Sequence, residues 1–567
     1  MNKYLKSLLI AVSILTLAFT SACAQLPKSG EIKIGPNVES GLETDYLYYS
    51  PSGPSENATQ EEVILGFLNA GTGPQNDYEV AKSYLTAKFR LEWDPNQTVL
   101  IQDGKPSVTL LANNTATIVV PIAAKINSRG QYQTMPKGST QTIALELSNV
   151  DGEWRIQSAP NLTTVIRPVF DVIFNSYALY FFDKQGKHLV PDVRWFPSRA
   201  STSTRLVSAL LGGPSEWLAS SVKTAIPAGT ALSLGTVTVA DGVATVDLSS
   251  KALKANAIDR QLMQTQIRET LIQLNSVYTV AVTVERSTLE SSNSWQIGQV
   301  QPQIVNPVGL VNGSLVHLDY ASAIPVPGTS SVTKQIAIDE FALNTDEKLI
   351  AVSGTSVKNN QIGIFLATLG QLVQEPRLLI TGTGYLSPIM DVDGFTWVVP
   401  KSAKQAIAVF DRDGKKVPFS AGWLSGIDRK SFSISSEGGR IVVAAGAKGA
   451  AQVYVAAVER DAQGNPVRLG TPIRPIRGVA AQSVTWLDNI RIGVLGENFE
   501  TYAQPLAIMI GGSSQSLSPI RNGAQIVGSG QAATVFILDG DKNMYQFRGS
   551  NWALIQTSVY SLHYPGN

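Results

Sequence analysis

The sequence of 567 residues predicts a multidomain chain in which two α+β domains precede a C-terminal all-β propeller. A chain of this length exceeds what one hydrophobic core supports, so we expect about three folded domains. Apolar residues recur at helical spacing only before about residue 303, and short strand patterns separated by turns fill the rest. The composition, 44% hydrophobic and 16% charged, is that of an ordinary globular protein.

The first folded region, residues 59–170, predicts an α+β domain of the NTF2/cystatin-like type. Thr59 and Glu62 form a capping-box pattern at the start of a helix. The apolar face expected for that helix contains Val63, Ile64, Phe67 and Leu68. After a second short helix at residues 77–85, the apolar period changes to two. The expected strands lie at residues 99–102, 116–122, 141–147 and 154–157, with an Asp151-Gly152 turn before the last.

The second region, residues 171–302, predicts another α+β domain with the order strand, helix, two strands, helix, strand. The expected elements are a strand at 179–182, a helix at 205–211, a hairpin across Asp241-Gly242, a long helix and a strand at 279–285. Gly212-Gly213-Pro214 is a strong end signal for the first helix. The stripe of the long helix contains Met263, Ile267, Leu271 and Leu274.

The third region, residues 303–567, predicts an all-β propeller. Strand patterns such as residues 433–435, 441–445 and 453–458 alternate with turns that contain Gly, Asp and Asn. The units repeat at roughly forty to fifty residues, the length of a four-stranded blade. We expect about six blades.

The first 58 residues predict export and lipidation. Lys3 and Lys6 precede an uncharged run at residues 7–19 and the small residues before Cys23, which is the layout of a secretory signal peptide over residues 1–22. The run is shorter than the roughly 20 residues that a spanning helix needs. Small residues before a lone cysteine resemble a bacterial lipobox, which implies that Cys23 carries an S-diacylglyceryl group and an N-acyl group such as palmitate. Residues 23–58 are then a tether.

Charge and motif patterns argue against several functions. The net charge of +1 gives no overall field that attracts nucleic acid. The three histidines, His188, His317 and His563, lack metal-ligand spacing, and with Cys23 lipidated no thiol remains for a zinc site. Residues 391–394 and 411–414 resemble the start of calcium loops but lack the remaining ligands, so we expect turns there. We therefore predict no cofactor, no metal and no catalytic residues.

One aromatic and basic cluster is a candidate for binding a partner. It consists of Arg194, Trp195, Phe196 and Arg199. Trp and Arg anchor many interfaces because they bury a large area and donate hydrogen bonds from a planar fork. The alternative is that Trp195 and Phe196 pack against opposite faces of a strand while the arginines are solvated.

Four phrases carry a resemblance to a known family. They are CAQLPKSG at residues 23–30, LVPDVRWFPSR at 189–199, RLVSALLGGP at 205–214 and SISSEGGRIVV at 433–443. Over nearly all of its exported region the chain resembles the actinobacterial LpqB lipoproteins, and its middle region is similar to the GerMN domain of spore and germination proteins. Where that family has a basic residue and Asp in the last phrase, this chain has Ser436 and Glu437.

The resemblance implies a protein anchored by lipid on the extracytoplasmic face of the cell membrane. It further implies binding to the extracellular domain of a sensor histidine kinase, MtrB of the MtrA–MtrB two-component system, with a role in cell-envelope homeostasis and division. The residues alone leave two alternatives: a cell-wall or glycan binder, and a hydrolase of envelope polymers.

Overall fold

The computed structural model describes residues 51–199, 201–291, 306–319, 322–370, 375–530 and 534–566. Cys23, the predicted leader and most of the predicted tether lie outside these residues. The described residues belong to one compact unit, which begins at Leu47. None of the helices within the described residues is long and apolar enough to cross a membrane.

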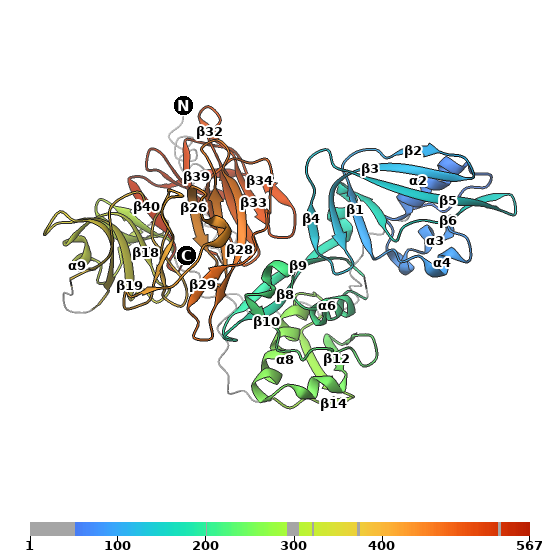
Figure 1. Ribbon diagram of the computed structural model, residues 1–567, viewed down its shortest axis with the longest axis horizontal. Helices are drawn as coiled ribbons and strands as arrows, with labels where there is room; N and C mark the ends of the chain where they lie inside the picture. Colours follow the sequence, from blue (N-terminus) through green and yellow to red (C-terminus); the bar gives the residue numbers. More distant parts are fainter. Residues whose placement is uncertain are drawn as a thin grey trace, which may run out of the picture. The chain divides into compact units, whose positions relative to one another are not determined.

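The first domain places three helices before a seven-stranded sheet (Figure 1). Its helices are α2 (Gln60–Ala70), α3 (Glu79–Ser83) and α4 (Phe89–Glu92). Its strands are β1 (Thr98–Gln102), β2 (Ser107–Leu110), β3 (Thr115–Asn127), β4 (Tyr132–Thr134), β5 (Thr140–Val150), β6 (Glu153–Ser158) and β7 (Thr163–Ile166). The strand order is β6-β5-β3-β1-β7, with β2 and β4 also paired to β3. Both hydrogen bonds of the expected capping box are present at Thr59 and Glu62.

Two apolar layers use the two faces of this sheet. Strand β3 alternates buried and half-buried residues, as expected for a strand with one covered face, whereas β1 places Leu100 in one layer and Val99 and Ile101 in the other. One layer contains Val63, Ile64, Phe67 and Leu68 of α2, as predicted. The other contains Val99, Ile101 and Ile126 together with residues that follow β7. The second layer is where the first domain meets the rest of the chain.

The second domain contains two small sheets and two longer helices, and α5 (Arg167–Ile173) leads into it. The sheets have the orders β10-β8-β9 and β11-β12-β13-β14, and β12 and β13 are parallel. Its strands are β8 (Phe174–Asp183), β9 (Leu189–Pro197), β10 (Val222–Lys223), β11 (Thr238–Ala240), β12 (Val243–Leu248), β13 (Thr279–Val284) and β14 (Ser287–Thr288). Its helices are α6 (Thr202–Leu211), α7 (Glu216–Ala219) and α8 (Ala257–Leu271).

Strand β9 is the main departure from the predicted order of elements. It pairs with β8 over nine residues, so the domain begins with a hairpin and not with a single strand. All nine residues of β9 are buried, including Asp192 and Arg194. A strand buried on both faces loses the alternation of apolar and polar residues by which strands are recognised.

Within its described residues, the C-terminal region forms a propeller of six four-stranded sheets. The strands of the first three sheets are β15 (Val308–Val311), β16 (Ser314–Asp319), β17 (Ser322–Pro325), β18 (Ile336–Leu343), β19 (Leu349–Ser356), β20 (Ile362–Thr368), β21 (Arg377–Thr381), β22 (Ile389–Met390), β23 (Thr396–Val398), β24 (Ala408–Phe410), β25 (Lys416–Val417) and the closing β40 (Val559–His563). The strands of the other three sheets are β26 (Arg429–Ile434), β27 (Arg440–Ala445), β28 (Gln452–Arg460), β29 (Pro466–Leu469), β30 (Ala481–Trp486), β31 (Arg491–Gly496), β33 (Pro505–Met509), β34 (Ser514–Ser516), β36 (Gly523–Gly528), β37 (Val535–Asp539), β38 (Met544–Arg548) and β39 (Asn551–Gln556). A short helix α9 (Ser330–Thr333) and the pair β32 (Tyr502–Ala503) and β35 (Ile520–Arg521) complete the region.

The ring closes because the last strand joins the first sheet. Strand β40 pairs antiparallel with β15, and Leu562 lies opposite Gly309. This contact brings both ends of the propeller sequence into one blade. The predicted fold class, a multidomain chain with α+β domains followed by an all-β propeller, is confirmed.

Aspartate turns recur between blade strands. The Oδ1 atoms of Asp391 and Asp411 each accept a hydrogen bond from the backbone N–H four residues later, at 2.9 and 2.8 Å. Asp461 and Asp539 make the same contact. The two phrases that resemble calcium loops therefore lie in hairpin turns stabilised by their own aspartates.

Candidate functional site

Strand β9 carries a buried ion pair at the boundary between the first two domains. Asp192 and Arg194 are two residues apart, so their side chains project from the same face of the strand. Nη2 of Arg194 lies 2.8 Å from Oδ2 of Asp192, and the side chains are 0% and 4% exposed. Burial lowers the pKa of Arg194, and the charge of Asp192 opposes that shift. The carboxylate thus lets the strand carry a buried guanidinium.

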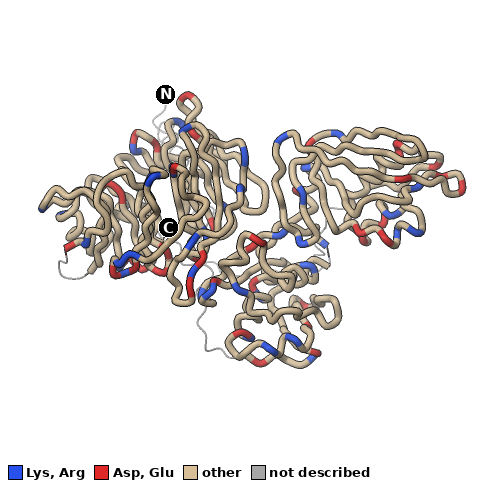
Figure 2. The backbone as a smooth tube through the Cα atoms, in the orientation of Figure 1, with Lys and Arg blue, Asp and Glu red and all other residues tan. Residues whose placement is uncertain are grey.

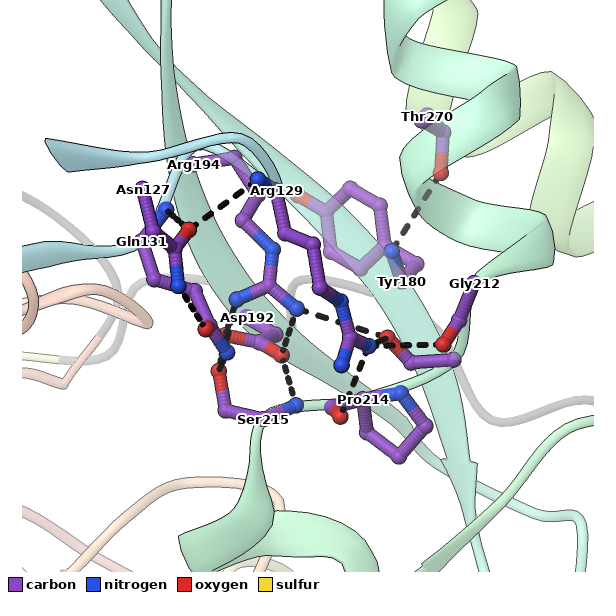
Figure 3. A network of polar contacts seen from close by, with 11 residues as sticks. Asn127, Arg129, Gln131, Tyr180, Asp192, Arg194, Gly212, Pro214, Ser215 and Thr270 are labelled. Atoms are coloured by element: carbon purple, nitrogen blue, oxygen red, sulfur yellow. Dashed lines mark hydrogen bonds and ion pairs between the residues drawn. The ribbon is translucent and has the colours of Figure 1, made fainter. Parts of the chain in front are cut away.

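Ser215 completes this ion pair (Figure 3). Its backbone N–H donates to Oδ2 of Asp192 at 2.6 Å, and its hydroxyl donates to Oδ1 at 2.8 Å. The same hydroxyl accepts a hydrogen bond from Nη1 of Arg194 at 2.6 Å. Ser215 precedes α7, so the pair ties β9 to the segment that follows α6.

The β3–β4 turn of the first domain binds the same segment. Nη2 of Arg129 donates to the carbonyl oxygens of Gly212 and Gly213 at 2.6 and 2.9 Å. Nε2 of Gln131 donates to the hydroxyl oxygen of Ser215 at 2.9 Å. The carbonyls at the end of α6 have no partner within the helix, and a cation is favoured there. The Gly-Gly-Pro stop of α6 is therefore also a docking point for the first domain.

Trp195 joins the first domain and the propeller from the opposite face of β9. Its ring lies 5.8 Å from that of Tyr132 and 5.1 Å from that of Phe170, centroid to centroid. Its Nε1 donates to the carbonyl oxygen of Gly511, in the turn after β33, at 2.7 Å. Phe196, the next residue, belongs to the core of the second domain. Trp195 and Phe196 therefore pack on opposite faces of the strand, but Arg194 is buried, so the expectation of solvated arginines is wrong for this residue.

A cleft of about 910 Å³ lies where the three domains meet. The first domain contributes Lys125 and Tyr132 to its wall, the second Trp217, and the propeller Arg474 and Arg477. Basic and acidic residues are otherwise interspersed along the described chain in Figure 2, in keeping with the net charge of +1. The wall of the cleft combines aromatic rings, amide groups and cations.

The four residues of the sequence-predicted cluster are placed differently from one another. Arg194, Trp195 and Phe196 are buried at 0%, 7% and 2% exposure in contacts within the chain. Arg199 is half-buried and donates from Nη2 to Oδ1 of Asn96 in the first domain at 3.2 Å. Their proposed binding of a partner protein stays a prediction, as does lipidation of Cys23, which lies outside the described residues.

The histidines make contacts of different kinds. His317 lies 3.1 Å from Glu347. His563 of β40, in the first sheet of the propeller, lies 3.2 Å from Glu340 of β18, in the second sheet. The backbone of His188 donates to Asp183 in the β8–β9 turn. Within the described residues, no three His, Cys, Asp or Glu side chains gather as a metal site would require.

Sequence reasoning missed the residues of the first domain that complete the boundary. Arg129, Gln131 and Asn96 contact residues 83 to 109 positions later in the chain. None of them lies in a recognisable motif. The Gly-Gly-Pro sequence at the end of α6 was the one signal for this contact, because the carbonyl groups at a helix end need hydrogen-bond donors from another part of the chain.

Comparisons with known proteins agree with this architecture. The family model described as "Lipoprotein LpqB, N-terminal domain" matches residues 53–171, and "Lipoprotein LpqB beta-propeller domain" matches residues 313–561. Between them, the model Germane, described as "Sporulation and spore germination", matches residues 178–290.

Curated relatives match most of the chain. Lipoprotein LpqB of Thermobifida fusca is 26% identical over 90% of this chain and 90% of its own. Lipoprotein LpqB of Streptomyces avermitilis is 23% identical over 96% of both chains. Among solved structures, the first GerMN domain of the sporulation protein GerM from Bacillus subtilis is 25% identical, covering 22% of this chain and 93% of that one with a TM-score of 0.18. Because both LpqB family models and full-length LpqB relatives match it, the chain belongs to the LpqB lipoprotein family.

Proposed function

We propose that this protein is an extracytoplasmic lipoprotein, anchored to the cell membrane through Cys23, that binds and modulates a sensor histidine kinase. The partner is the extracellular domain of an MtrB-like kinase of the MtrA–MtrB type, and the role lies in envelope homeostasis and division. The observation that carries the proposal is LpqB family membership over most of the chain. The proposal includes a signal peptide at residues 1–22 and a tether at residues 23–58.

The contacts between domains support a role in binding. Through β9, the first domain, the second domain and the propeller share one apolar layer that contains Ile126, Phe170 and Trp195, with Met509 packed against it. A body joined in this way presents fixed surfaces, and a lipid anchor confines those surfaces near membrane proteins. Confinement raises the effective concentration of a partner without a strong intrinsic affinity.

Capture from native membranes tests this proposal. The lipidated protein is crosslinked in cells, purified in detergent, and its partners are identified by mass spectrometry. We expect a histidine kinase to be enriched, and the enrichment to fall by tenfold or more in Cys23→Ala because the variant leaves the membrane. Failure to capture the kinase, together with no binding to its purified extracellular domain, would contradict the proposal.

The cleft favours a second candidate function, binding of a cell-wall glycan. Tyr132 and Trp217 line the cleft beside the amides of Asn127, Gln131 and Gln133. Aromatic faces next to amide groups suit sugar rings, which have apolar faces and hydroxyl edges. Retention of the protein on purified peptidoglycan, lost in Trp217→Ala but kept in Trp552→Ala, would support this function. Equal retention of both variants, or none of the unmodified protein, would count against it.

A further inference from the structure

Two arginines of the second domain converge on one neutral oxygen of the first domain. Nη1 of Arg205, in α6, donates to Oδ1 of Asn96 at 2.8 Å. Nη2 of Arg199, which follows β9, donates to the same oxygen at 3.2 Å. An oxygen within hydrogen-bond distance of both groups holds two positive side chains close together.

Within the described part of the chain, this arginine pair forms no ion pair, although two carboxylates lie in its surroundings. Among the described residues, no Asp or Glu forms an ion pair with Arg199 or Arg205, and Asp77 and Asp94 act on Arg205 only at longer range. Tyr78 lies beside the pair, but burial raises the pKa of its phenol, which stays neutral at pH 7. Burial and then the charge of Arg199 lower the pKa of Arg205 to about 10, so Arg205 remains charged at pH 7.

One donor of the pair also lacks an acceptor. Nε of Arg199 is buried without a hydrogen-bond partner. Arg205 lies in the first turn of α6, a ten-residue helix whose N-terminus has no side-chain cap. Unpaired N–H groups at a helix N-terminus favour an anion. Buried donors without acceptors are costly, and an incoming anion would satisfy them.

We propose that Arg199 and Arg205 form a binding site for a phosphate group at the boundary between the first and second domains. A phosphate monoester carries about −1.5 to −2 charges near pH 7, enough to neutralise two guanidinium groups, whereas a carboxylate carries one. Planar guanidinium forks bind the oxygens of phosphate in pairs. Both arginines are half-buried, so solvent reaches them. The site is independent of the kinase and glycan proposals.

Thermal unfolding of the full chain in a non-ionic, phosphate-free detergent tests the site. Inorganic phosphate and glycerol 3-phosphate are titrated separately in the low millimolar range, with sodium chloride keeping the ionic strength constant. We expect the midpoint to rise by about 2–4 °C at a tenfold excess over Kd. A response to both probes identifies free phosphate as sufficient, and a response to the monoester alone identifies an esterified ligand. No response to either overturns the proposal.

Three variants separate this site from the general stabilisation that phosphate salts give. Arg205→Gln should lose the rise, and Arg521→Gln, which removes an exposed arginine of β35, should keep it. Asn96→Asp supplies an internal countercharge, so its midpoint should be higher without phosphate and should no longer respond to it. An equal rise in Arg205→Gln and the unmodified protein would overturn the proposal. If Arg205→Gln does not fold, a rise retained in Asn96→Asp would overturn it as well.

Discussion

Arg194 and Arg205 both belong to the second domain and both lie against the first, yet their surroundings differ in one respect. Arg194 donates to both carboxylate oxygens of Asp192 and to the hydroxyl of Ser215. Arg205 donates to the amide oxygen of Asn96 and lies over the ring of Phe196 at 5.1 Å. Within the described residues, the first arginine forms an ion pair and the second does not.

The difference indicates separate uses for the same residue type. A buried guanidinium that is paired and hydrogen-bonded holds its neighbours in one arrangement, because each group would be left unpaired if they separated. A partly buried guanidinium that forms no ion pair adds little to the free energy of unfolding. It keeps its charge available for an anion from solution. The boundary between the two domains therefore contains an arginine held in an ion pair, Arg194, and a pair of arginines suited to a ligand, Arg199 and Arg205.

The largest expected effect is loss of stability in Arg194→Met. Removal of the guanidinium leaves the Asp192 carboxylate buried without its ion-pair partner, which typically lowers the free energy of unfolding by about 3–5 kcal/mol. Urea unfolding followed by far-UV circular dichroism measures the change. The double variant Asp192→Leu with Arg194→Met removes both charges and should recover part of the loss. A loss below about 1 kcal/mol in the single variant would contradict the structural role of the pair.

Trp195→Phe tests the other face of β9. The phenyl ring keeps most of the stacking with Tyr132 and Phe170 but cannot donate to Gly511, so we expect a loss of about 1 kcal/mol. Trp552→Phe is the matched control, because its Nε1 donates at the same distance of 2.7 Å to Ser518 within the propeller. Limited proteolysis between the second domain and the propeller should accelerate only in Trp195→Phe. Equal acceleration in both variants would mean that Trp195 does not join the domains.

Most of the fold could be predicted from local patterns. The capping box at Thr59 predicted the start of α2 correctly, and the turns at Asp151-Gly152 and Asp241-Gly242 joined strands as expected. In both turns the two residues have positive φ, which Asp tolerates and Gly adopts freely. Strand β9 was missed because a strand buried on both faces has no alternation to recognise.

Less of the candidate site could be predicted. The sequence singled out Arg194, Trp195 and Arg199 by residue type, but it did not distinguish a paired arginine from an unpaired one. Arg194 is paired with Asp192, but Ser215, which completes that pair, and Asn96, which accepts from Arg205, reach β9 and α6 through the tertiary fold. Contacts between residues 21 and 109 positions apart leave no periodic signal in a single sequence.

In the propeller, the charge of Glu340 can be removed reversibly by a change of pH, so the stabilising effect of a paired charge can be tested there without a substitution. Burial raises the pKa of this carboxyl. The hydrogen bond and charge of His563, together with hydrogen bonds from Ser561 and Ser387, outweigh burial and lower the pKa below its usual value of 4.5. The folded carboxylate is thus stabilised above about pH 4.5, and this contribution is lost as the pH falls through the lowered pKa. Because the side chain is 37% exposed, solvent limits the contribution to about 1 kcal/mol or less.

The comparison with Glu340→Gln isolates this contribution. The unmodified protein should be the more stable of the two at pH 7, and the difference should shrink as the pH falls through the lowered pKa of Glu340, where its carboxyl becomes neutral like the amide of Gln. Urea unfolding across this range measures it. A difference that does not change with pH would mean that the charge of Glu340 contributes nothing to closure of the propeller at β40.

The smallest expected effect is that of Arg205→Met, and it is the sharpest test of the comparison. The variant loses the bond to Asn96 and the contact with the ring of Phe196, each worth about 1 kcal/mol or less. It also removes repulsion between Arg205 and Arg199, which offsets that loss. We therefore expect a net change within about 1 kcal/mol in urea unfolding without phosphate, against several kcal/mol for Arg194→Met. A loss as large as that of Arg194→Met would show that Arg205 is held by the fold itself, and the distinction between the two arginines would then fail.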